Sequence, residues 1–407
     1  MQYDLIVVGG GAAGFFGAIQ AAEMKPGIKV LILEKTNKIL SKVKVSGGGR
    51  CNVTHHDYNP FSLARHYPRG EKALKNLFKI YHAEHVVNWF ASKGVILKAE
   101  EDGRMFPVTD SSETIIECFL KETHRLGIKI QTGCQVTGIA PTLSGFQVMS
   151  GNGTVYQTDK ILIAPGGSSN QQSYIWISVL MHSIAAPIPS LFTFNDSGKN
   201  FADLMGISVP AAEVRIEGTK FAQRGPILIT HWGLSGPAVI KLSAWAAQYL
   251  HSVDYTFTAM VNWIGLGEEE VRASLLEWKS ERSRQRVSTD SLFGLPQRLS
   301  RRLWEQAAVE ESKTWSELST KNLNKVVELL IRSPFQIKGK TTFKEEFVTC
   351  GGVKLSDVDL TTMQSKKVKS IYFAGEVLDI DGETGGFNFQ SAWTTAFVAA
   401  KAIVSEK

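Results

Sequence analysis

Short apolar runs alternate with helical patterns over the first part of the chain. Tyr3–Val8 is a β-branched apolar run of the kind that fills a strand buried on both faces of a parallel sheet. The alanine-rich stretch Phe15–Met24 predicts a helix, Pro26-Gly27 ends it, and Lys29–Glu34 predicts a second strand. A strand, a helix and a second strand in this order indicate an α/β fold with a parallel sheet.

The glycines between the first strand and the first helix predict a dinucleotide site. Gly9-Gly10-Gly11-Ala12-Ala13-Gly14 has the spacing G-x-G-x-x-G, and Glu34 follows twenty residues after the last glycine. In this context Gly9 makes the tight turn, Gly11 lets the pyrophosphate approach the backbone, and Gly14 lets the helix pack closely on the strand. The helix N-terminus offers N–H groups to the phosphates, and Glu34 is expected to accept hydrogen bonds from ribose hydroxyls.

The end of the chain indicates that the dinucleotide is FAD. Lys369–Glu376 is a further buried strand that ends in Gly-Glu, and Thr384–Gln390 leads into an alanine-rich helix at Ser391–Val404. This ending is similar to that of flavoproteins of the glutathione-reductase type, in which the acid meets the ribityl chain and the last helix points its N-terminus at the flavin pyrimidine edge. Lys160–Gly167 resembles the strand and turn beneath the cofactor in those proteins. The sequence has no second G-x-G-x-x-G, so NAD(P)H is expected only as a transient reductant.

Composition narrows the class of protein. Apolar residues make up 43% of the 407 residues and charged residues 21%, as in ordinary globular proteins, and no apolar run approaches the about 18 residues of a membrane span. The four cysteines lie far apart, and His55-His56 has no third ligand at a suitable spacing, so no metal site is expected. The chain shows no secretion signal, which predicts a cytoplasmic enzyme. Its length predicts two or three domains, or one large domain that carries an insertion. The pattern does not indicate an oligomeric state.

Several blocks of sequence identify a family resemblance. The blocks follow one another along nearly the whole chain, at Lys42–Thr54, Asp102–Pro107, Thr230–Pro237, Val348–Val353, Thr362–Lys366 and Ala374–Asp379. They resemble the BaiN/RdsA flavoprotein family, whose members are also described as aminoacetone-oxidase-like FAD-binding proteins.

The resemblance implies a Rossmann-like FAD-binding domain of the glutathione-reductase type, interrupted by an inserted β-barrel with a small helical subdomain. The expected boundaries are 1–188 and 344–407 for the FAD-binding domain, 189–265 and 335–343 for the barrel, and 266–334 for the helices. The sequence agrees, because short β-like runs at Ala212–Ile216, Pro226–Thr230 and Tyr255–Val261 precede a charged stretch of helical period at Glu268–Arg332.

Two departures from the family concern the region beside the flavin. Pro165 stands where members usually carry Thr, and Ser168–Trp176 replaces a segment that is usually rich in glycine. The loss of these glycines is expected to alter the wall beside the flavin while leaving FAD binding intact.

Most of the predicted cofactor contacts come from the glycine motif with Glu34, from the end of the chain after Lys369, and from the loop Ser46–Asn52. The glycines of this loop allow backbone contact with a ligand. Lys42 is expected to contact phosphate or substrate, with a solvated lysine as the alternative. The full set is Gly9, Gly11, Ala13, Gly14, Glu34, Lys35, Lys42, Ser46, Gly47, Gly48, Arg50, Cys51, Asn52, Val136, Ala164, Gly166, Gly352, Gly375, Glu376, Gly385, Gly386, Phe387 and Asn388.

Two residues are candidates for proton transfer. Arg50 could neutralise an anion and lower the pKa of the adjacent Cys51, which would then donate or accept a proton; the alternative is a packed, inert thiol. His231 precedes Trp232-Gly233 in a loop expected over the cofactor and could act as a general acid or base; a structural histidine is the alternative.

The sequence leaves the substrate open between two classes. Members of the resembled family include ribosomal RNA dihydrouridine synthases, and the basic stretch Lys279–Arg302, flanked by Trp278 and Trp304, could contact an RNA backbone. A solvated helical face is the alternative for that stretch. The family also includes proteins assigned to amine oxidation and to reduction of unsaturated steroid acids, which would need an aromatic pocket with walls such as Trp176, Phe192 and Trp232. A non-catalytic flavoprotein is a third possibility. The leading prediction is an FAD-dependent reductase of a uridine in ribosomal RNA.

Overall fold

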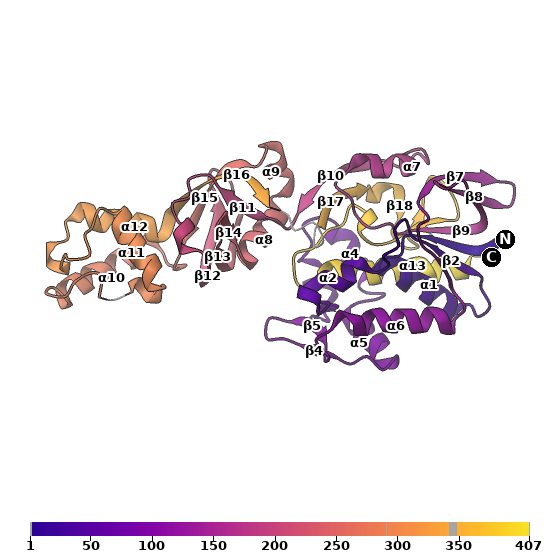
Figure 1. Ribbon diagram of the computed structural model, residues 1–407, viewed down its shortest axis with the longest axis horizontal. Helices are drawn as coiled ribbons and strands as arrows, with labels where there is room; N and C mark the ends of the chain where they lie inside the picture. The colour runs from indigo at the N-terminus through magenta and orange to yellow at the C-terminus, as the bar shows by residue number, and fades with distance from the viewer. Residues whose placement is uncertain (1, 290, 342–347, 407) are drawn as a thin grey trace. The chain divides into compact units, whose positions relative to one another are not determined.

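The chain folds into two compact units (Figure 1). The computed structural model describes residues 2–289, 291–341 and 348–406. One unit comprises Met1–Ser190 and Phe343–Lys407, and the other comprises Leu191–Thr342. The predicted fold class is confirmed, because a Rossmann-like unit is interrupted in sequence by a closed barrel with helices. The boundary expected at residues 343 and 344 lies outside the described residues.

The Rossmann-like unit is built on a parallel sheet. Its parallel strands lie in the order β6 (Lys129–Gln131), β2 (Val30–Leu33), β1 (Gln2–Val8), β9 (Val155–Ile163) and β20 (Ile371–Phe373). Val7 pairs with Ile32 on one side and with Leu162 on the other, so the first strand is buried at the centre as its apolar run predicts. Antiparallel strands extend the sheet: β7 (Val136–Thr142) and β8 (Gly145–Ser150) beside β9, and β19 (Gln364–Ser365) and β18 (Val358–Asp359) beyond β20.

Two buried helices pack along each other against this sheet, α1 (Ala12–Met24) and α13 (Phe387–Ser405) (Figure 1). A Cβ atom at Gly17 would lie 2.5 Å from the Leu162 side chain, so a glycine is needed for α1 to approach β9 this closely. Both helices begin three or four residues before their alanine-rich segments. The residues that precede those segments therefore belong to the first turn of each helix, at the edge of the sheet where the strands end.

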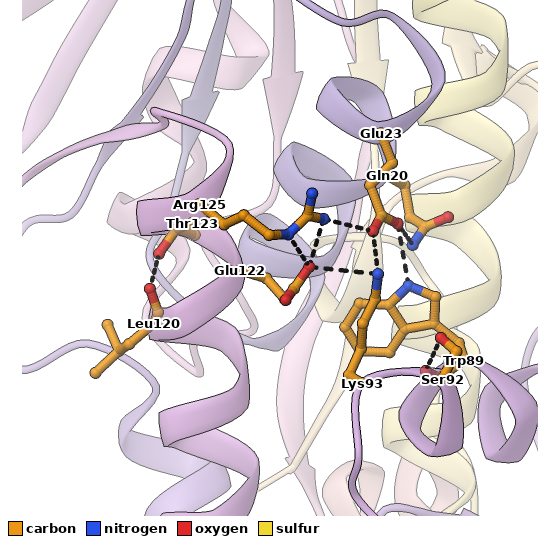
Figure 2. Close-up of polar contacts among 9 residues, drawn as sticks. All are labelled: Gln20, Glu23, Trp89, Ser92, Lys93, Leu120, Glu122, Thr123 and Arg125. Carbon is orange, nitrogen blue, oxygen red and sulfur yellow. Dashed lines mark hydrogen bonds and ion pairs between the residues drawn. The ribbon is translucent and has the colours of Figure 1, made fainter.

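A network of charged side chains ties α1 to α5 (Ala83–Ser92) and α6 (Ser112–Arg125) (Figure 2). Glu23 of α1 accepts hydrogen bonds from Lys93 and, at 3.2 Å, from the indole of Trp89. Glu122 of α6 is 5% exposed and pairs with Arg125 at 2.6 Å and with Lys93 at 3.3 Å. Burial acts to raise the pKa of Glu122, but the hydrogen bonds from Arg125 and Lys93 outweigh it and lower the pKa below its usual value.

The remaining elements of this unit are short. The helices are α2 (Ser41–Gly49), α3 (Pro60–Ala64), α4 (Glu71–Leu77) and α7 (Ile175–Ser178). A small sheet has the order β3 (Thr54–His55), β5 (Arg104–Pro107) and β4 (Leu97–Ala99), and β10 (Ile184–Ser190) pairs with β17 (Val348–Val353). The altered segment Ser168–Trp176 includes a 3-10 turn at Gln171–Tyr174 and the start of α7.

The second unit is a closed barrel followed along the chain by helices. The barrel has the strand order β11 (Thr193–Asp196), β14 (Gly233–Ser235), β13 (Ala222–Ile229), β12 (Ser208–Ile216), β15 (Thr256–Asn262) and β16 (Ser333–Thr341). The three predicted β-like runs lie in β12, β13 and β15. Its helices are α8 (Pro237–Trp245), α9 (Ala247–Ser252), α10 (Glu268–Glu281), α11 (Gln297–Gln306) and α12 (Thr320–Arg332). None of the helices in the described parts of the chain has the length and hydropathy needed to span a membrane.

Candidate functional site: a dinucleotide cradle

The turn after β1 brings strand and helix unusually close. Gly9 has φ of +114°, and a Cβ atom there would lie 2.2 Å from the carbonyl oxygen of Ala164 at the end of β9. A Cβ atom at Gly14 would lie 1.9 Å from the carbonyl oxygen of Gly9. Only glycine fits at these two positions. Ala13 faces Gly375, so the first turn of α1 also contacts the segment after β20.

Glu34 lies beside this turn at the end of β2. Its Oε2 accepts a hydrogen bond from Gly10 N at 2.8 Å, and its Oε1 accepts from the N and Oγ1 of Thr36 at 2.9 Å. Lys35, which follows Glu34, is exposed. Cys134 N donates to Glu34 O at 2.8 Å, and this bond brings the start of β7, with the buried Val136, to the end of β2. The structure therefore gathers three predicted residues, Glu34, Lys35 and Val136, where the adenosine end of a dinucleotide would lie.

The predicted glycine loop is the irregular end of α2. Ser46, Gly47 and Gly48 have non-helical dihedral angles, and a Cβ atom at Gly48 would meet nothing within 4 Å. The guanidinium of Arg50 stacks over the Phe106 ring at 4.0 Å and donates to Glu100 at 2.6 Å. Arg50 therefore anchors the loop to the small sheet formed by β3, β5 and β4.

The expectation that Arg50 lowers the pKa of Cys51 is wrong. The Cys51 side chain is fully buried, and burial raises the pKa of its thiol to about 12. The positive charge of Arg50 is instead paired with Glu100 and, at 3.6 Å, with Asp110. The packed, inert thiol considered for Cys51 is the arrangement that the structure favours.

The segment after Cys51 lies against the start of α13. The Asn52 amide, oriented by its neighbours, accepts from Gly386 N and donates to Thr54 O, both at 3.0 Å. Trp393 Nε1 donates to Val53 O at 2.9 Å, and His55 Nδ1 donates to Gly385 O at 3.1 Å. Predicted cofactor residues from opposite ends of the chain, Asn52 and Gly386, are thus in direct contact.

A third group surrounds Glu376, which follows β20. Its carboxylate accepts from Lys42 Nζ at 2.6 Å and from Thr349 N at 2.8 Å. A Cβ atom at Gly167 would lie 2.6 Å from both Glu376 Oε1 and Thr349 Oγ1, whereas at Gly166 it would meet nothing within 4 Å. The Thr349 hydroxyl oxygen is buried and, within the described chain, lacks a hydrogen-bond partner. Gly352 of β17 packs on the backbone of the residues that follow Glu376.

Three groups of residues together form what we call the dinucleotide cradle: the turn after β1 with Glu34, the loop Ser46–Asn52 with the start of α13, and the surroundings of Glu376. The cradle fits a dinucleotide that carries a flavin. The N-caps of α1 and α13 are glycines without a side-chain hydrogen bond, and neither helix has an acid in its first turn. Such helix N-termini are suited to phosphate and to the anionic edge of a flavin. Open space above Gly11, Gly48 and Gly166 allows backbone contact with a ligand, and the buried hydroxyl of Thr349 lacks only an acceptor or donor.

Beside the predicted residues Phe387 and Asn388, the structure adds two residues that the sequence did not indicate, His66 and Glu383. Phe387 is buried, and its ring stacks on His66 with the centroids 4.2 Å apart. The side chain of Asn388 is occupied with the backbone of Gly382, accepting at 2.9 Å and donating at 3.0 Å. His66 Nδ1 donates to Glu383 Oε2 at 3.1 Å. No motif marks His66 or Glu383. Only the position of Glu383, two residues before Gly385, could have suggested Glu383 from the sequence.

Of the predicted pocket walls, Trp176 is half-buried in α7 of the Rossmann-like unit, whereas Phe192 and Trp232 belong to the barrel unit, as does His231. His231 is exposed, and its ring packs edge-on against Trp232 at 4.2 Å. Phe192 is buried in the barrel core. Trp304, one of the two aromatic residues predicted to flank the basic stretch, is 2% exposed and packs on Trp315, so its ring is not available to RNA. Within the described residues no group of three or more His, Cys, Asp or Glu side chains could hold a metal ion.

Comparison with known proteins places the chain in a family. The model of the HI0933-like protein Rossmann domain matches residues 3–402. The chain belongs to the HI0933-like Rossmann family. Two curated relatives match over almost their whole length. A ribosomal RNA dihydrouridine synthase of Haemophilus influenzae is 29% identical over 414 residues, which cover 99% of each chain. A 3-dehydro-bile acid delta(4,6)-reductase of Clostridium scindens is 26% identical over 418 residues, which cover 97% of this chain and 98% of the relative.

The fold of this HI0933-like protein also occurs among solved structures. The 3-ketosteroid-delta4-(5alpha)-dehydrogenase of Rhodococcus jostii superposes with a TM-score of 0.53 at 13% identity, covering 98% of this chain and 97% of that one. A likeness at this identity concerns the fold. Family membership and the dinucleotide cradle together make this HI0933-like protein an FAD-dependent oxidoreductase.

Proposed function

We propose that this protein uses reduced FAD to add hydrogen across a carbon–carbon double bond, and that its substrate is a uridine of ribosomal RNA. The observation that carries the proposal is the match, over 99% of both chains, to a ribosomal RNA dihydrouridine synthase. Conversion of uridine to dihydrouridine saturates one C=C bond of the base. The name of the second relative, a delta(4,6)-reductase, also denotes saturation of a C=C bond.

The residues of the cradle bind and orient the cofactor in this proposal. When bound, FAD supplies hydride chemistry, and NAD(P)H is the proposed transient reductant. Glu34 holds the ribose at one end, and the N-terminus of α1 meets the pyrophosphate. Glu376, kept in place by Lys42 and Thr349, faces the ribityl chain. The N-terminus of α13 stabilises negative charge at the flavin pyrimidine edge.

Part of the basic stretch in the barrel unit supports an RNA partner. Arg284 and Arg286 are exposed after the end of α10, and the guanidinium of Arg282 lies over the Trp278 ring at 4.9 Å. Arg302, by contrast, pairs with a carboxylate of its own unit at 2.6 Å. The RNA-contacting surface is therefore proposed at Arg282–Arg286, where cations and a partly accessible aromatic ring lie together.

The test is the dihydrouridine content of ribosomal RNA from cells with and without the gene. A site that is lost on deletion and restored by the wild-type chain supports the proposal, and an unchanged RNA contradicts the substrate assignment. With an rRNA substrate, the proposed location of the enzyme is the cytoplasm. The purified enzyme then needs to modify an rRNA fragment with NAD(P)H as the electron source.

A matched pair of variants tests the RNA surface. Arg284→Ala with Arg286→Ala should weaken binding of an rRNA fragment and lower the salt dependence of its Kd, because each phosphate contact contributes to the salt slope. Lys321→Ala with Lys325→Ala removes the same charge from exposed positions of α12 and serves as the control. Equal effects of the two double variants would show that only net charge matters and would remove Arg282–Arg286 from the proposal.

A small unsaturated ketone is the second candidate substrate. The bile acid reductase matches this chain at nearly the same identity and coverage as the RNA enzyme. The altered segment Ser168–Trp176 also forms a 3-10 turn and a short helix where the family usually has glycines. Reduction of 4-en-3-one steroids or of 2-cyclohexenone by the purified enzyme, with no change in cellular rRNA, would favour this candidate.

A further inference from the structure

Two histidines and a phenylalanine form an aromatic cluster at the start of α13. The His66 ring lies nearly parallel to the Phe387 ring, at 12° and 4.2 Å, and the His55 ring stacks on Phe387 at 4.6 Å. The two imidazole centroids are 5.9 Å apart. Tyr67 OH donates to Phe387 O at 2.6 Å and fixes the backbone next to the cluster. Since Phe387 follows Gly385-Gly386 directly, the cluster adjoins the helix end that fits the flavin.

One of these histidines is paired with a buried carboxylate. His66 Nδ1 donates to Glu383 Oε2 at 3.1 Å, and Glu383 N donates back to His66 O at 2.9 Å. The Glu383 side chain is 8% exposed, whereas that of His66 is 32% exposed. A carboxylate on Nδ1 fixes the orientation of the imidazole ring. The other nitrogen, Nε2, lies on the far side of the ring from Glu383.

The second histidine differs in its environment. Burial, together with the nearby His66, lowers the pKa of His55, and its Nδ1–H is directed to Gly385 O. His55 therefore has its Nδ1 occupied by a backbone carbonyl, whereas His66 has its Nδ1 on the carboxylate of Glu383. His55 faces His66 from β3, and Glu383 faces it from the loop before α13.

We infer that His66, oriented by Glu383, is the proton donor to the substrate carbon during reduction of the C=C bond. The inference rests on the proposed function. Saturation of the bond needs one hydride and one proton. The hydride comes from reduced flavin at one carbon. The electron pair of the double bond then forms a C–H bond at the neighbouring carbon with the Nε2 proton of His66, whose N–H electron pair stays on nitrogen. Water reprotonates the partly exposed imidazole. Glu383 is a positioning residue.

The first arm of the test locates His66 relative to the cofactor without any substrate. Apo-protein labelled with 15N-histidine is titrated with FAD, and the imidazole signals are assigned with His66→Gln. The His66 signals should shift on FAD binding, and those of His124, which is exposed on α6, should not. An unmoved His66 signal at saturating FAD overturns the inference.

The second arm separates the two halves of the reaction. FAD-loaded enzyme is reduced without oxygen and mixed with an rRNA fragment or 2-cyclohexenone, and reoxidation is followed by flavin absorbance. His66→Gln should slow reoxidation by about 100-fold or more, the usual range for loss of a general acid, while FAD content and reduction by NAD(P)H stay as in the wild type. His124→Gln is the matched control.

The pH profile distinguishes proton donation from a structural role. Wild-type reoxidation should slow as the pH rises, because a general acid must carry its proton to donate it, and His66→Gln should remove this decline. Glu383→Gln should slow reoxidation less than His66→Gln, and Glu383→Asp should restore part of the rate. If His66→Gln does not retain FAD, the Glu383 variants provide the same comparison.

The two possible failures can be told apart. If the wild-type enzyme is reoxidised by neither substrate, the proposed function fails. If the wild type is reoxidised and His66→Gln keeps a rate within about tenfold of it, with the same pH profile, the inference about His66 is overturned while the proposed function stands.

Discussion

A buried ion pair holds together the two segments that carry His66 and Glu383. The guanidinium of Arg69 donates to both carboxylate oxygens of Asp381, with the Nε to Oδ1 distance at 2.5 Å. Ser190 Oγ donates to Asp381 Oδ2 at 2.9 Å. The Asp381 side chain has 0% exposure and that of Arg69 has 12%. Asp381→Asn would therefore remove the carboxylate that binds this largely buried guanidinium directly.

The expected cost follows from this burial. Removal of one partner of a buried ion pair typically destabilises a protein by roughly 3–5 kcal/mol, because the remaining charge stays desolvated. We expect Asp381→Asn to lower the free energy of unfolding of the Rossmann-like unit by this amount. Urea titration followed by hydrogen exchange of α13 peptides measures it, since α13 belongs to this unit alone.

Two further variants test the reasoning. Glu113→Gln breaks an exposed pair with Lys44 in the same unit and should cost less than about 1 kcal/mol. Arg69→Met combined with Asp381→Asn removes both charges and should recover most of the lost stability. A cost below about 1 kcal/mol for Asp381→Asn, or a double variant less stable than Asp381→Asn, would refute the assignment of the loss to an isolated buried charge.

Three other changes have defined outcomes. Gly14→Ala should abolish retention of FAD on purification, since its Cβ atom would lie 1.9 Å from Gly9 O, whereas Gly138→Ala meets only the flexible end of a methionine side chain and should retain it. The pKa of Glu122 is lowered in the folded protein, so its ion pairs stabilise the fold at pH values above the unfolded-state pKa of about 4.3. This stabilisation is lost as the pH falls through the folded-state pKa, and Glu122→Gln should therefore reduce the decline in the free energy of unfolding at acid pH. Cys51, with its pKa raised to about 12, should react with iodoacetamide at pH 7.5 only after denaturation, as mass spectrometry can show.

The dinucleotide turn could be predicted from the sequence because its chemistry is local. Gly9, Gly14 and Glu34 act through a strand, a turn and a helix that are consecutive in the chain, and the structure gives them the close contacts that this order requires. The barrel was predictable only as a set of short strands. Its closure depends on β11 pairing with β16, far along the chain, and no spacing rule specifies such a pairing.

Side-chain direction explains what the sequence could not show. Arg50 and Cys51 are neighbours in sequence, but the guanidinium turns to Glu100 and Phe106 while the thiol turns into the core. His66 and Glu383 are separated by 317 positions, and their contact depends on Phe387 stacking and on the ion pair beside them. Interactions of this kind arise only once the tertiary fold has formed.

The same contacts imply that the cofactor site is completed by the last part of the chain. Asn52, His55, His66 and Arg69 each find their polar partner between residues 381 and 386. Without the last segment these side chains would lose those partners, and each partner lost by a buried polar group costs about 1–3 kcal/mol. The packing of α13 and the formation of the flavin end of the cradle are therefore expected to occur together during folding. A ligand that binds only the completed cradle stabilises that event by mass action, so FAD binding and the folding of this unit are thermodynamically linked.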